Sequence, residues 1–220
     1  MLSQTTLGIF SQSKTAQLKP KIQIRKANEN DIKDIINIVN VTFPATYKDA
    51  KTKKPCFSQC DLDRICQDLE KDYRNILFNK LDNHHAIFVA CDHEKSVGFA
   101  KITKDDKASF LDKLYVLPKF QGHNYGNLLL LACMKKSLFE FDSNQIRLEV
   151  WDGNAAGIRY YEKNQFHSTT ITHAKITSEG VFKGIEMICE EAPAAYDKLL
   201  NYLHFKDSGN VITPVNERKW

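Results

Sequence analysis

Residues 114–136, LYVLPKFQGHNYGNLLLLACMKK, constrain the fold more than any other stretch of the chain. A run of β-forming side chains ends at a proline, passes through a short polar loop with two glycines, and enters an apolar helix. No aspartate or glutamate lies between Leu114 and Phe139. The first N–H groups of a helix lack intrahelical partners, and the helix dipole places partial positive charge there. The stretch therefore predicts a strand, an anion-binding turn and a helix, with a phosphate as the expected ligand.

The loop itself has the residues that such a turn needs. Gly122 and Gly126 let a phosphate approach the backbone without an intervening Cβ, and Lys119 and His123 add positive potential. A loop with two glycines is, taken alone, more often an ordinary strand-to-helix turn. The phosphate interpretation needs a second signal from elsewhere in the chain.

The spacing of hydrophobic residues distinguishes the other elements of the chain. It has a helical period in two early segments, and from His85 onward most segments show the two-residue period of a strand. Asn28 or Asn30 is the expected N-cap of the first helix, and Asp152 or Asn154 that of a later one. The residues from 44 to 59, with two prolines and several lysines, are expected to form an exposed loop. Strands are predicted at 21–27, 85–92, 96–104, 108–117, 145–152, 166–177 and 182–190. Helices are predicted at 28–43, 61–78, 154–166 and 194–205, in addition to the helix of the opening stretch. The order β-α-α-β-β-β-α-β-α-β-β indicates an α+β fold with a mixed sheet.

Length and composition favour a single domain. The 220 residues suffice for one core, and we expect a loosely ordered leader over 1–20, one domain over 21–190, and a C-terminal helix with a polar tail over 191–220. The 31 basic residues are interleaved with 27 acidic ones, which indicates no nucleic-acid partner. No apolar run approaches the length of about 20 residues that spans a membrane. The six cysteines lack the paired spacing of a zinc site, so we expect no metal. The first twenty residues lack the pattern of a signal peptide, so we expect reduced thiols and a cytoplasmic location.

Two motifs resemble those of the GNAT superfamily of N-acetyltransferases. VLPKFQGHNYG is similar to the family's strand ending near V-x-P followed by [RQ]-x-x-G-x-[GA], with Gln121 first, Gly126 last, and Asn124 where the family usually has glycine. Asn enters the left-handed backbone region more readily than other non-glycine residues do. Downstream, NAAGIRYYEKNQF resembles N-x-x-A-x-x-x-Y-x-x-x-G-F.

In this second motif Asn154, Tyr161 and Phe166 are in register, whereas Gly157 replaces alanine and Gln165 replaces glycine. The resemblance covers Ile22 to about Glu190. It implies a central, mostly antiparallel sheet, splayed between its fourth and fifth strands and flanked by helices on both faces. It also implies acetyl-CoA as cosubstrate. The cofactor-binding residues that it implies are Leu114, Tyr115, Val116, Gln121, Gly122, His123, Asn124, Tyr125, Gly126, Asn127, Asn154 and Tyr161.

The same resemblance implies direct attack of an amine on the thioester. Tyr161 would then be the general acid for the departing thiolate, because a phenol can protonate a thiolate. Without the motif, Tyr161 would be interpreted as an aromatic residue on the packed face of a helix. Asp112 and Glu149 are the candidate general bases, and each is equally compatible with an outward-facing carboxylate on an alternating strand.

The acceptor is the least constrained part of the prediction. TFPATY, LDKLYVLPKFQG and RLEVWDGNAAGIRYYEKNQF look most like the spermidine/spermine N-acetyltransferase branch, so the best guess is a small amine or polyamine. A protein or peptide amine, or a catalytically silent CoA-binding module, are the alternatives. The carboxylates of the second helix suit a polyamine, but lysines and arginines are interspersed among them, as on a solvated helix face. No nucleic acid or membrane partner is expected, and a homodimer is left open.

Overall fold

Within the described residues, seven strands and five α-helices follow one another in the predicted order. The computed structural model describes residues 22–48, 52, 54–79, 82–177 and 180–206, so the predicted leader over 1–20 and the end of the tail lie outside the described residues. The strands are β1 (Ile22–Lys26), β2 (His85–Asp92), β3 (Lys95–Thr103), β4 (Ser109–Val116), β5 (Ile146–Trp151), β6 (His167–Thr177) and β7 (Gly180–Cys189). The helices are α1 (Ile32–Thr46), α2 (Gln59–Phe78), α3 (Tyr125–Phe139), α4 (Ala155–Lys163) and α5 (Ala192–Lys206), with 3-10 turns at Glu29–Asp31 and Pro118–Phe120.

The strands form one sheet in the order β1-β2-β3-β4-β5-β7-β6. All neighbouring pairs are antiparallel except β4 and β5, which run parallel. The β4–β5 ladder is short, because only Ser109–Leu111 pairs with Ile146–Leu148. The predicted mixed, mostly antiparallel sheet with a splay between its fourth and fifth strands is therefore confirmed.

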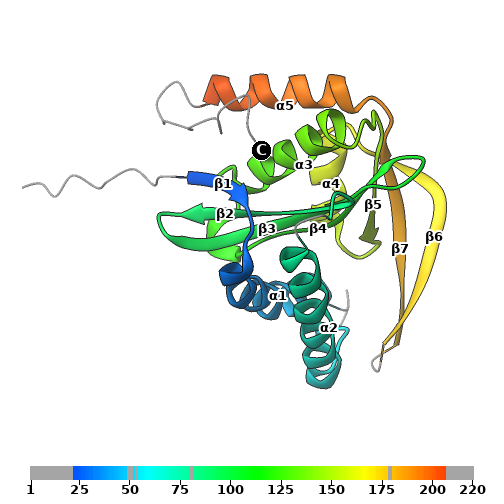
Figure 1. Ribbon diagram of the computed structural model, residues 1–220. Helices are drawn as coiled ribbons and strands as arrows, with labels where there is room; N and C mark the ends of the chain where they lie inside the picture. Colours follow the sequence, from blue (N-terminus) through cyan, green and yellow to red (C-terminus); the bar gives the residue numbers. More distant parts are fainter. Residues whose placement is uncertain (1–21, 49–51, 53, 80–81, 178–179, 207–220) are drawn as a thin grey trace, which may run out of the picture.

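Helices cover both faces of the sheet. In Figure 1, α3, α4 and α5 lie above the strands, and α1 and α2 lie below them. Each face has its own core, because successive side chains of a strand point to opposite sides. On β2, Ala86, Phe88 and Ala90 pack toward α3, while Ile87 and Val89 pack toward α1 and α2.

The first helix is longer than predicted. We expected it to end at Phe43 because Pro44 follows, but α1 continues through Pro44 to Thr46. A proline has no N–H group to donate to the helix, and it restricts the backbone of the residue before it. The last turn of α1 is nevertheless closed, because the Tyr47 N–H donates to the Phe43 carbonyl at 2.9 Å. Phe43 is buried in the core beneath the sheet, and this packing outweighs the local preference.

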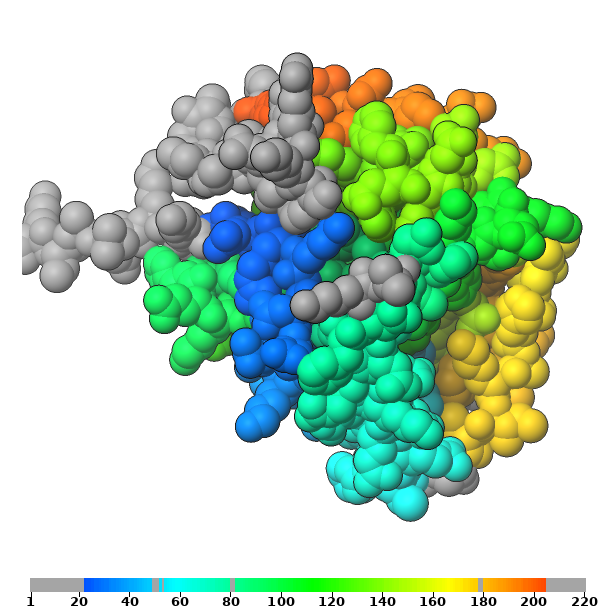
Figure 2. All heavy atoms as spheres, viewed as in Figure 1, coloured from blue at the N-terminus to red at the C-terminus, as the bar shows by residue number. Residues whose placement is uncertain are grey.

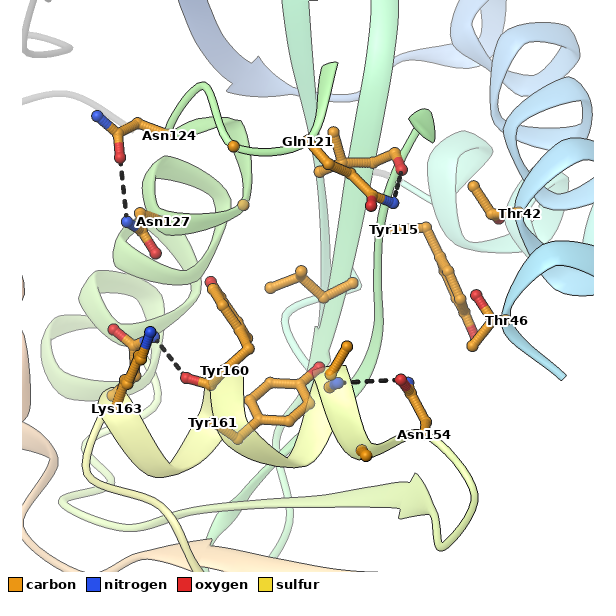
Figure 3. A pocket seen from close by; sticks show the side chains of 18 of the residues that line it. Thr42, Thr46, Tyr115, Gln121, Asn124, Asn127, Asn154, Tyr160, Tyr161 and Lys163 are labelled. Atoms are coloured by element: carbon orange, nitrogen blue, oxygen red, sulfur yellow. Dashed lines mark hydrogen bonds between the residues drawn. The ribbon is translucent and has the colours of Figure 1, made fainter. Parts of the chain in front are cut away.

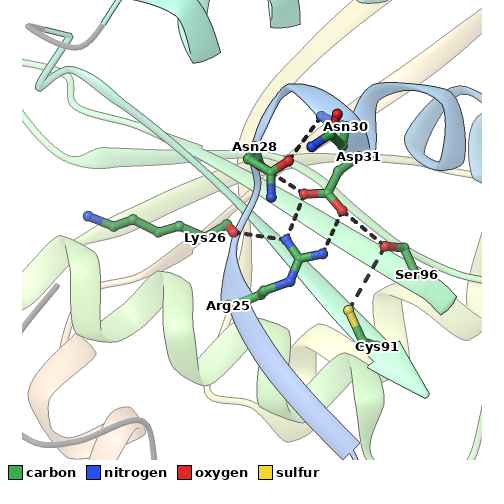
Figure 4. A network of polar contacts seen from close by, with 7 residues as sticks. All are labelled: Arg25, Lys26, Asn28, Asn30, Asp31, Cys91 and Ser96. Atoms are coloured by element: carbon green, nitrogen blue, oxygen red, sulfur yellow. Dashed lines mark hydrogen bonds and ion pairs between the residues drawn. The ribbon is translucent and has the colours of Figure 1, made fainter. Parts of the chain in front are cut away.

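A polar network fixes the passage from β1 into α1 (Figure 4). Asn28 and Asp31 form a reciprocal capping box at the 3-10 turn Glu29–Asp31. Asn28, one of the two predicted caps, therefore caps this turn, whereas the N-cap of α1 itself is Asp31. Arg25 donates two hydrogen bonds to the Asp31 carboxylate, at 2.6 and 2.7 Å, and Ser96 Oγ donates a third at 3.3 Å. Burial alone would raise the pKa of Asp31, but these donors outweigh it and hold the pKa below its usual value.

The described residues show two further features. None of the helices within the described ranges is both long and apolar enough to cross a membrane. All six cysteines are free thiols, and four of them, Cys66, Cys91, Cys133 and Cys189, are buried.

Candidate active site

The divergence of β4 and β5 creates the opening around which the site is built. Beyond Leu111, β4 continues to pair with β3, and beyond Leu148, β5 continues to pair with β7. The facing edges of the two strands are therefore left without a strand partner. Gln121 follows the 3-10 turn Pro118–Phe120, and its side-chain amide donates back to the Val116 carbonyl at the end of β4, at 2.9 Å.

A cavity of about 1000 Å³ lies at this opening, on the α3 side of the sheet, and Figure 3 shows its lining. It is bounded by the end of β4, the start of α3, one face of α4, the end of α1 and the buried side of α5. We call it the first cavity. Its lining includes Thr42, Ala45, Thr46, Leu114, Tyr115, Val116, Gln121, Gly122, Asn124, Gly126, Asn127, Asn154, Gly157, Tyr160, Tyr161, Lys163, Lys198 and Tyr202.

The start of α3 presents bare backbone N–H groups to the first cavity. Asn124 is the N-cap and adopts a left-handed conformation, with φ 66°, as expected for the position where the family pattern has glycine. Its side chain caps no backbone N–H, because it accepts instead from the Asn127 amide at 3.2 Å. The first turn contains no acidic residue. This arrangement suits an anion.

Two of the predicted loop residues do not line the first cavity. The Tyr125 side chain points into the core, where it is 2% exposed and packs edge-on against Phe120. Burial, with a smaller contribution from Asp92, raises the pKa of Tyr125 to about 12. His123 is exposed on the surface. Tyr125 can therefore contribute its backbone, but not its side chain, to anion binding. A role of His123 in cofactor binding stays a prediction.

Helix α4 supplies the polar residues of the second motif. Asn154 caps it by accepting a hydrogen bond from the Gly157 N–H at 2.9 Å. A Cβ on Gly157 would lie 2.4 Å from the Asn154 amide nitrogen, so the glycine accommodates this conformation of Asn154. Gln165 adopts the left-handed conformation of the glycine that it replaces, with φ 69°.

The two adjacent tyrosines of α4 point in different directions (Figure 3). Tyr161 points toward the splay, and Tyr160 points toward α3. The Tyr160 hydroxyl is buried and, among the described residues, has no hydrogen-bond partner. Burial raises the pKa of both phenols well above its usual value, so both stay protonated at physiological pH.

Several lining residues were not predicted from the sequence. Lys198 and Tyr202 reach the first cavity from α5, which lies beyond the predicted domain. Thr42 and Thr46 come from the end of α1, and Lys163 from the end of α4. The amphipathic spacing of α5 predicted a helix, but spacing alone does not say what a helix packs against.

Comparison with known proteins decides the family. A model of the acetyltransferase (GNAT) family matches residues 36–166, which is more than half of the chain. The chain belongs to the GNAT family. An uncharacterized N-acetyltransferase of Archaeoglobus fulgidus is 26% identical over 143 residues, which cover 64% of this chain and 89% of the relative.

Solved structures show the same fold. The PaiA N-acetyltransferase of Thermoplasma acidophilum, solved in complex with coenzyme A, superposes with a TM-score of 0.59 at 21% identity, over 75% of this chain and 97% of its own. A variant of the spermidine N-acetyltransferase SpeG of Vibrio cholerae gives 0.56 at 15% identity, over 83% and 98%. The ribosomal-protein-S18-alanine N-acetyltransferase of Escherichia coli gives 0.52 at 20% identity, over 76% and 92%.

This GNAT protein is an acetyl-CoA-dependent N-acetyltransferase, and the first cavity has the features that acetyl-CoA requires. The start of α3 suits a pyrophosphate, and the absence of a side chain at Gly126 leaves room for it. The unpaired edge of β4 offers backbone groups to an amide-containing arm such as pantetheine. The unpartnered Tyr160 hydroxyl is a further hydrogen-bonding group beside Gly126, where a Cβ would lie 3.5 Å from it.

A second cavity of this acetyltransferase, of about 440 Å³, lies on the α2 side of the same splay. Tyr115 lines both cavities. In Figure 2 the surface is hollowed between α2, in cyan, and β6, in yellow. The second cavity is lined by seven aromatic residues, which are Phe43, Tyr47, Phe57, Phe110, Tyr115, Trp151 and Phe182. All of them except Phe110 contact another of these rings. Five carboxylates and three basic side chains complete the charged lining: Asp61, Asp68, Asp72, Asp112, Glu149, Arg64, Lys113 and Lys175.

Both predicted bases face the second cavity, and each is already paired with lysine. Asp112 accepts from Lys101 at 3.0 Å and also contacts Lys113. Burial alone would raise the pKa of Asp112, but the two ammonium groups outweigh it and hold the pKa below its usual value. Glu149 is paired with Lys175 at 2.5 Å. The structure thus brings the two bases together on one side of the splay and Tyr161 on the other.

Proposed function

We propose that this acetyltransferase moves the acetyl group of acetyl-CoA to the primary amine of a small molecule, with a polyamine or related amine as acceptor. Acetyl-CoA occupies the first cavity and the amine enters through the second. The observation that carries the proposal is the meeting of the two cavities at Tyr115, at the splay of the sheet. The amine then attacks the thioester directly, without an intermediate bound to the protein.

The chemistry of the second cavity supports a cationic acceptor. Aromatic faces and carboxylates both favour an ammonium group. Asp61, Asp68 and Asp72 follow one another at intervals of seven and four residues, so they share one face of α2. Asp61 is engaged in capping α2 through Ser58, whereas Asp68 and Asp72 are exposed and form no ion pair within the described chain. A row of carboxylates of this kind suits an acceptor with more than one positive charge.

The resemblance to spermidine N-acetyltransferases in fold is compatible with this substrate class. The second cavity is walled by α2 on one side and by β6 and β7 on the other, which suits a small molecule better than an extended peptide. A silent CoA-binding module is disfavoured, because Tyr161 and Asn154 both line the first cavity.

We assign Tyr161 as the proton donor to the departing thiolate. Its hydroxyl points toward the splay and stays protonated, as a donor must. The burial that raises the pKa of the phenol also raises that of a thiol in the same cavity, so the transfer stays feasible. Asp112 is the weaker candidate base because two lysines hold its pKa below the usual value, and a carboxylate of lower pKa accepts a proton less readily. Glu149, acting directly or through water, is therefore the preferred base.

An acceptor panel tests the proposal. CoA thiol release is followed with acetyl-CoA and butylamine, spermidine or a peptide with a free N-terminus. We expect turnover with the amines and the lowest KM with spermidine. Asp68→Asn should raise the KM for spermidine about two- to fivefold, the size expected for one exposed charge pair. Asp63→Asn, on the same helix but outside the cavity, is the matched control. Turnover with the peptide alone would refute a small-amine acceptor, and acetyl-CoA binding without turnover would favour the silent module.

A further inference from the structure

One ammonium group of the protein already occupies the second cavity. Lys175, on β6, extends to Glu149, on β5, and the Nζ–Oε1 distance is 2.5 Å. Both residues line the second cavity. The Lys175 side chain is 53% exposed and that of Glu149 is 19% exposed, so the lysine approaches the carboxylate from the solvent side.

The backbone beside Glu149 leaves room for this carboxylate. Glu149 lies over Gly184 of β7, where a Cβ would come within 2.3 Å of its carboxyl carbon. Any larger residue at position 184 would displace the carboxylate. The glycine therefore leaves the space in which the Glu149 carboxylate lies, and the Lys175 ammonium contacts the carboxylate at that position.

We propose that Lys175 is an internal competitor for the acceptor ammonium and thereby a determinant of acceptor specificity. This inference rests on the proposed function of the second cavity. An incoming amine has to displace the Lys175 ammonium before its own nitrogen reaches Glu149. Lys175 therefore weakens the binding of cationic acceptors and has no effect on neutral molecules of the same shape.

The pair of an exposed lysine and a half-buried carboxylate is weak enough to be displaced. Exposed ion pairs contribute little to stability, because water screens them and two long side chains lose freedom. The Lys175 stem is long and lies on a hairpin whose β6 strand is exposed along most of its length. Displacement needs only a rotation of this side chain, and no movement of the sheet.

Binding to the second cavity can be measured without turnover. Trp151 lines this cavity and packs against Tyr47 in a tilted arrangement, with ring centroids 5.7 Å apart, so its fluorescence reports occupancy. Trp220 is the second of the two tryptophans in the chain, and Trp220→Phe provides a background in which Trp151 is the sole emitter. Butylamine is the cationic probe, and butanol is its neutral counterpart.

In this background Lys175→Gln should lower the Kd for butylamine about two- to fivefold, the range expected for removal of one exposed competing charge. The Kd for butanol should not change. Lys183→Gln, on the neighbouring strand of the same hairpin and outside the cavity lining, is the matched control and should leave both values unchanged. In turnover, Lys175→Gln should lower the KM for butylamine.

The outcomes separate this inference from the proposed function. If wild-type protein turns over amines but Lys175→Gln leaves the butylamine Kd unchanged or raises it, Lys175 is not a competitor and the acceptor assignment stands. If Lys175→Gln tightens butanol equally, the lysine acts through volume and the inference fails. If no amine binds or reacts with either protein, both are overturned. Glu149→Gln gives an internal check, because Lys175→Gln should have no further effect in that background.

Discussion

Tyr160 and Tyr161 are sequence neighbours with different surroundings. The Tyr161 hydroxyl points toward the splay where β4 and β5 part, whereas the Tyr160 hydroxyl is buried beside the start of α3. Tyr161→Phe should lower kcat by about 10² to 10⁴, the usual range for a positioned acid, and leave the Kd for acetyl-CoA nearly intact. Tyr160→Phe should instead weaken acetyl-CoA binding with a small change in kcat.

Stopped-flow turnover and calorimetric titration of both variants check this split. Equal kcat for Tyr161→Phe and wild type would remove Tyr161 from the mechanism. Far-ultraviolet circular dichroism of each variant controls for loss of fold.

Asp31 makes a pH-dependent contribution to stability. Its folded-state pKa lies below the unfolded value near 4, so the contribution is fully present above that value and is lost as the pH falls through the folded-state pKa. Asp31→Asn removes the ionised partner of Arg25 and should cost about 2 kcal/mol of unfolding free energy at pH 7. Urea titrations from pH 7 to 3 should show the difference between wild type and variant shrink below about pH 4. A constant difference would mean that Asp31 acts through its shape alone.

At the scale of the element, the partial positive charge at the start of α3 comes from the helix dipole and the free backbone N–H groups, and not from side chains. No side chain caps it within the described chain, and its first turn has no acidic residue. Gly126→Glu places a carboxylate at the expected pyrophosphate position and should weaken acetyl-CoA binding at least tenfold. Gly126→Gln, of the same size but neutral, should weaken it less, because only steric exclusion remains. Calorimetric Kd values for both variants check this, and equal losses would show that volume, not charge, decides.

The elements also show how far the sequence predicts this structure. Hydrophobic periodicity was enough for every strand and helix in its order, because each strand and helix buries one face against a core. Local rules misplaced the end of α1, since Pro44 is tolerated once Phe43 is buried. The role of α5 was also missed. Its buried leucines, Leu199 and Leu203, are ordinary amphipathic spacing, and only the fold reveals that Lys198 thereby reaches the first cavity.

The sequence predicted residues of the first cavity but not the second cavity as a whole, because local patterns do not say which distant elements pack together. Motif residues such as Asn154 and Tyr161 lie at the first cavity, because the motif encodes a local strand, turn and helix. The second cavity combines residues from α1, α2, β4, β5, β6 and β7, which are distant in the sequence. No local pattern predicts that Lys175 would meet Glu149 across the sheet.

At the scale of the whole molecule, the sheet separates two layers of helices, and the two cavities meet where the sheet is open. α3, α4 and α5 cover the face with the first cavity, and α1 and α2 cover the face with the second. Because β4 and β5 separate beyond Leu111, Tyr115 lines both cavities. Its hydroxyl forms a hydrogen bond with the Tyr47 hydroxyl at 3.1 Å. A group held in one cavity can therefore react with a group held in the other without either leaving its site.

This arrangement predicts that both substrates are bound at once. Initial rates measured over a grid of acetyl-CoA and amine concentrations should give intersecting double-reciprocal lines, because no acetylated enzyme is formed between two half-reactions. The Cys133 thiol is a poor nucleophile, because it is buried and burial raises its pKa and keeps it protonated. Intact-protein mass spectrometry after incubation with acetyl-CoA alone should accordingly show no acetyl thioester. Parallel lines together with an acetyl adduct that Cys133→Ala abolishes would replace direct attack with a two-step mechanism.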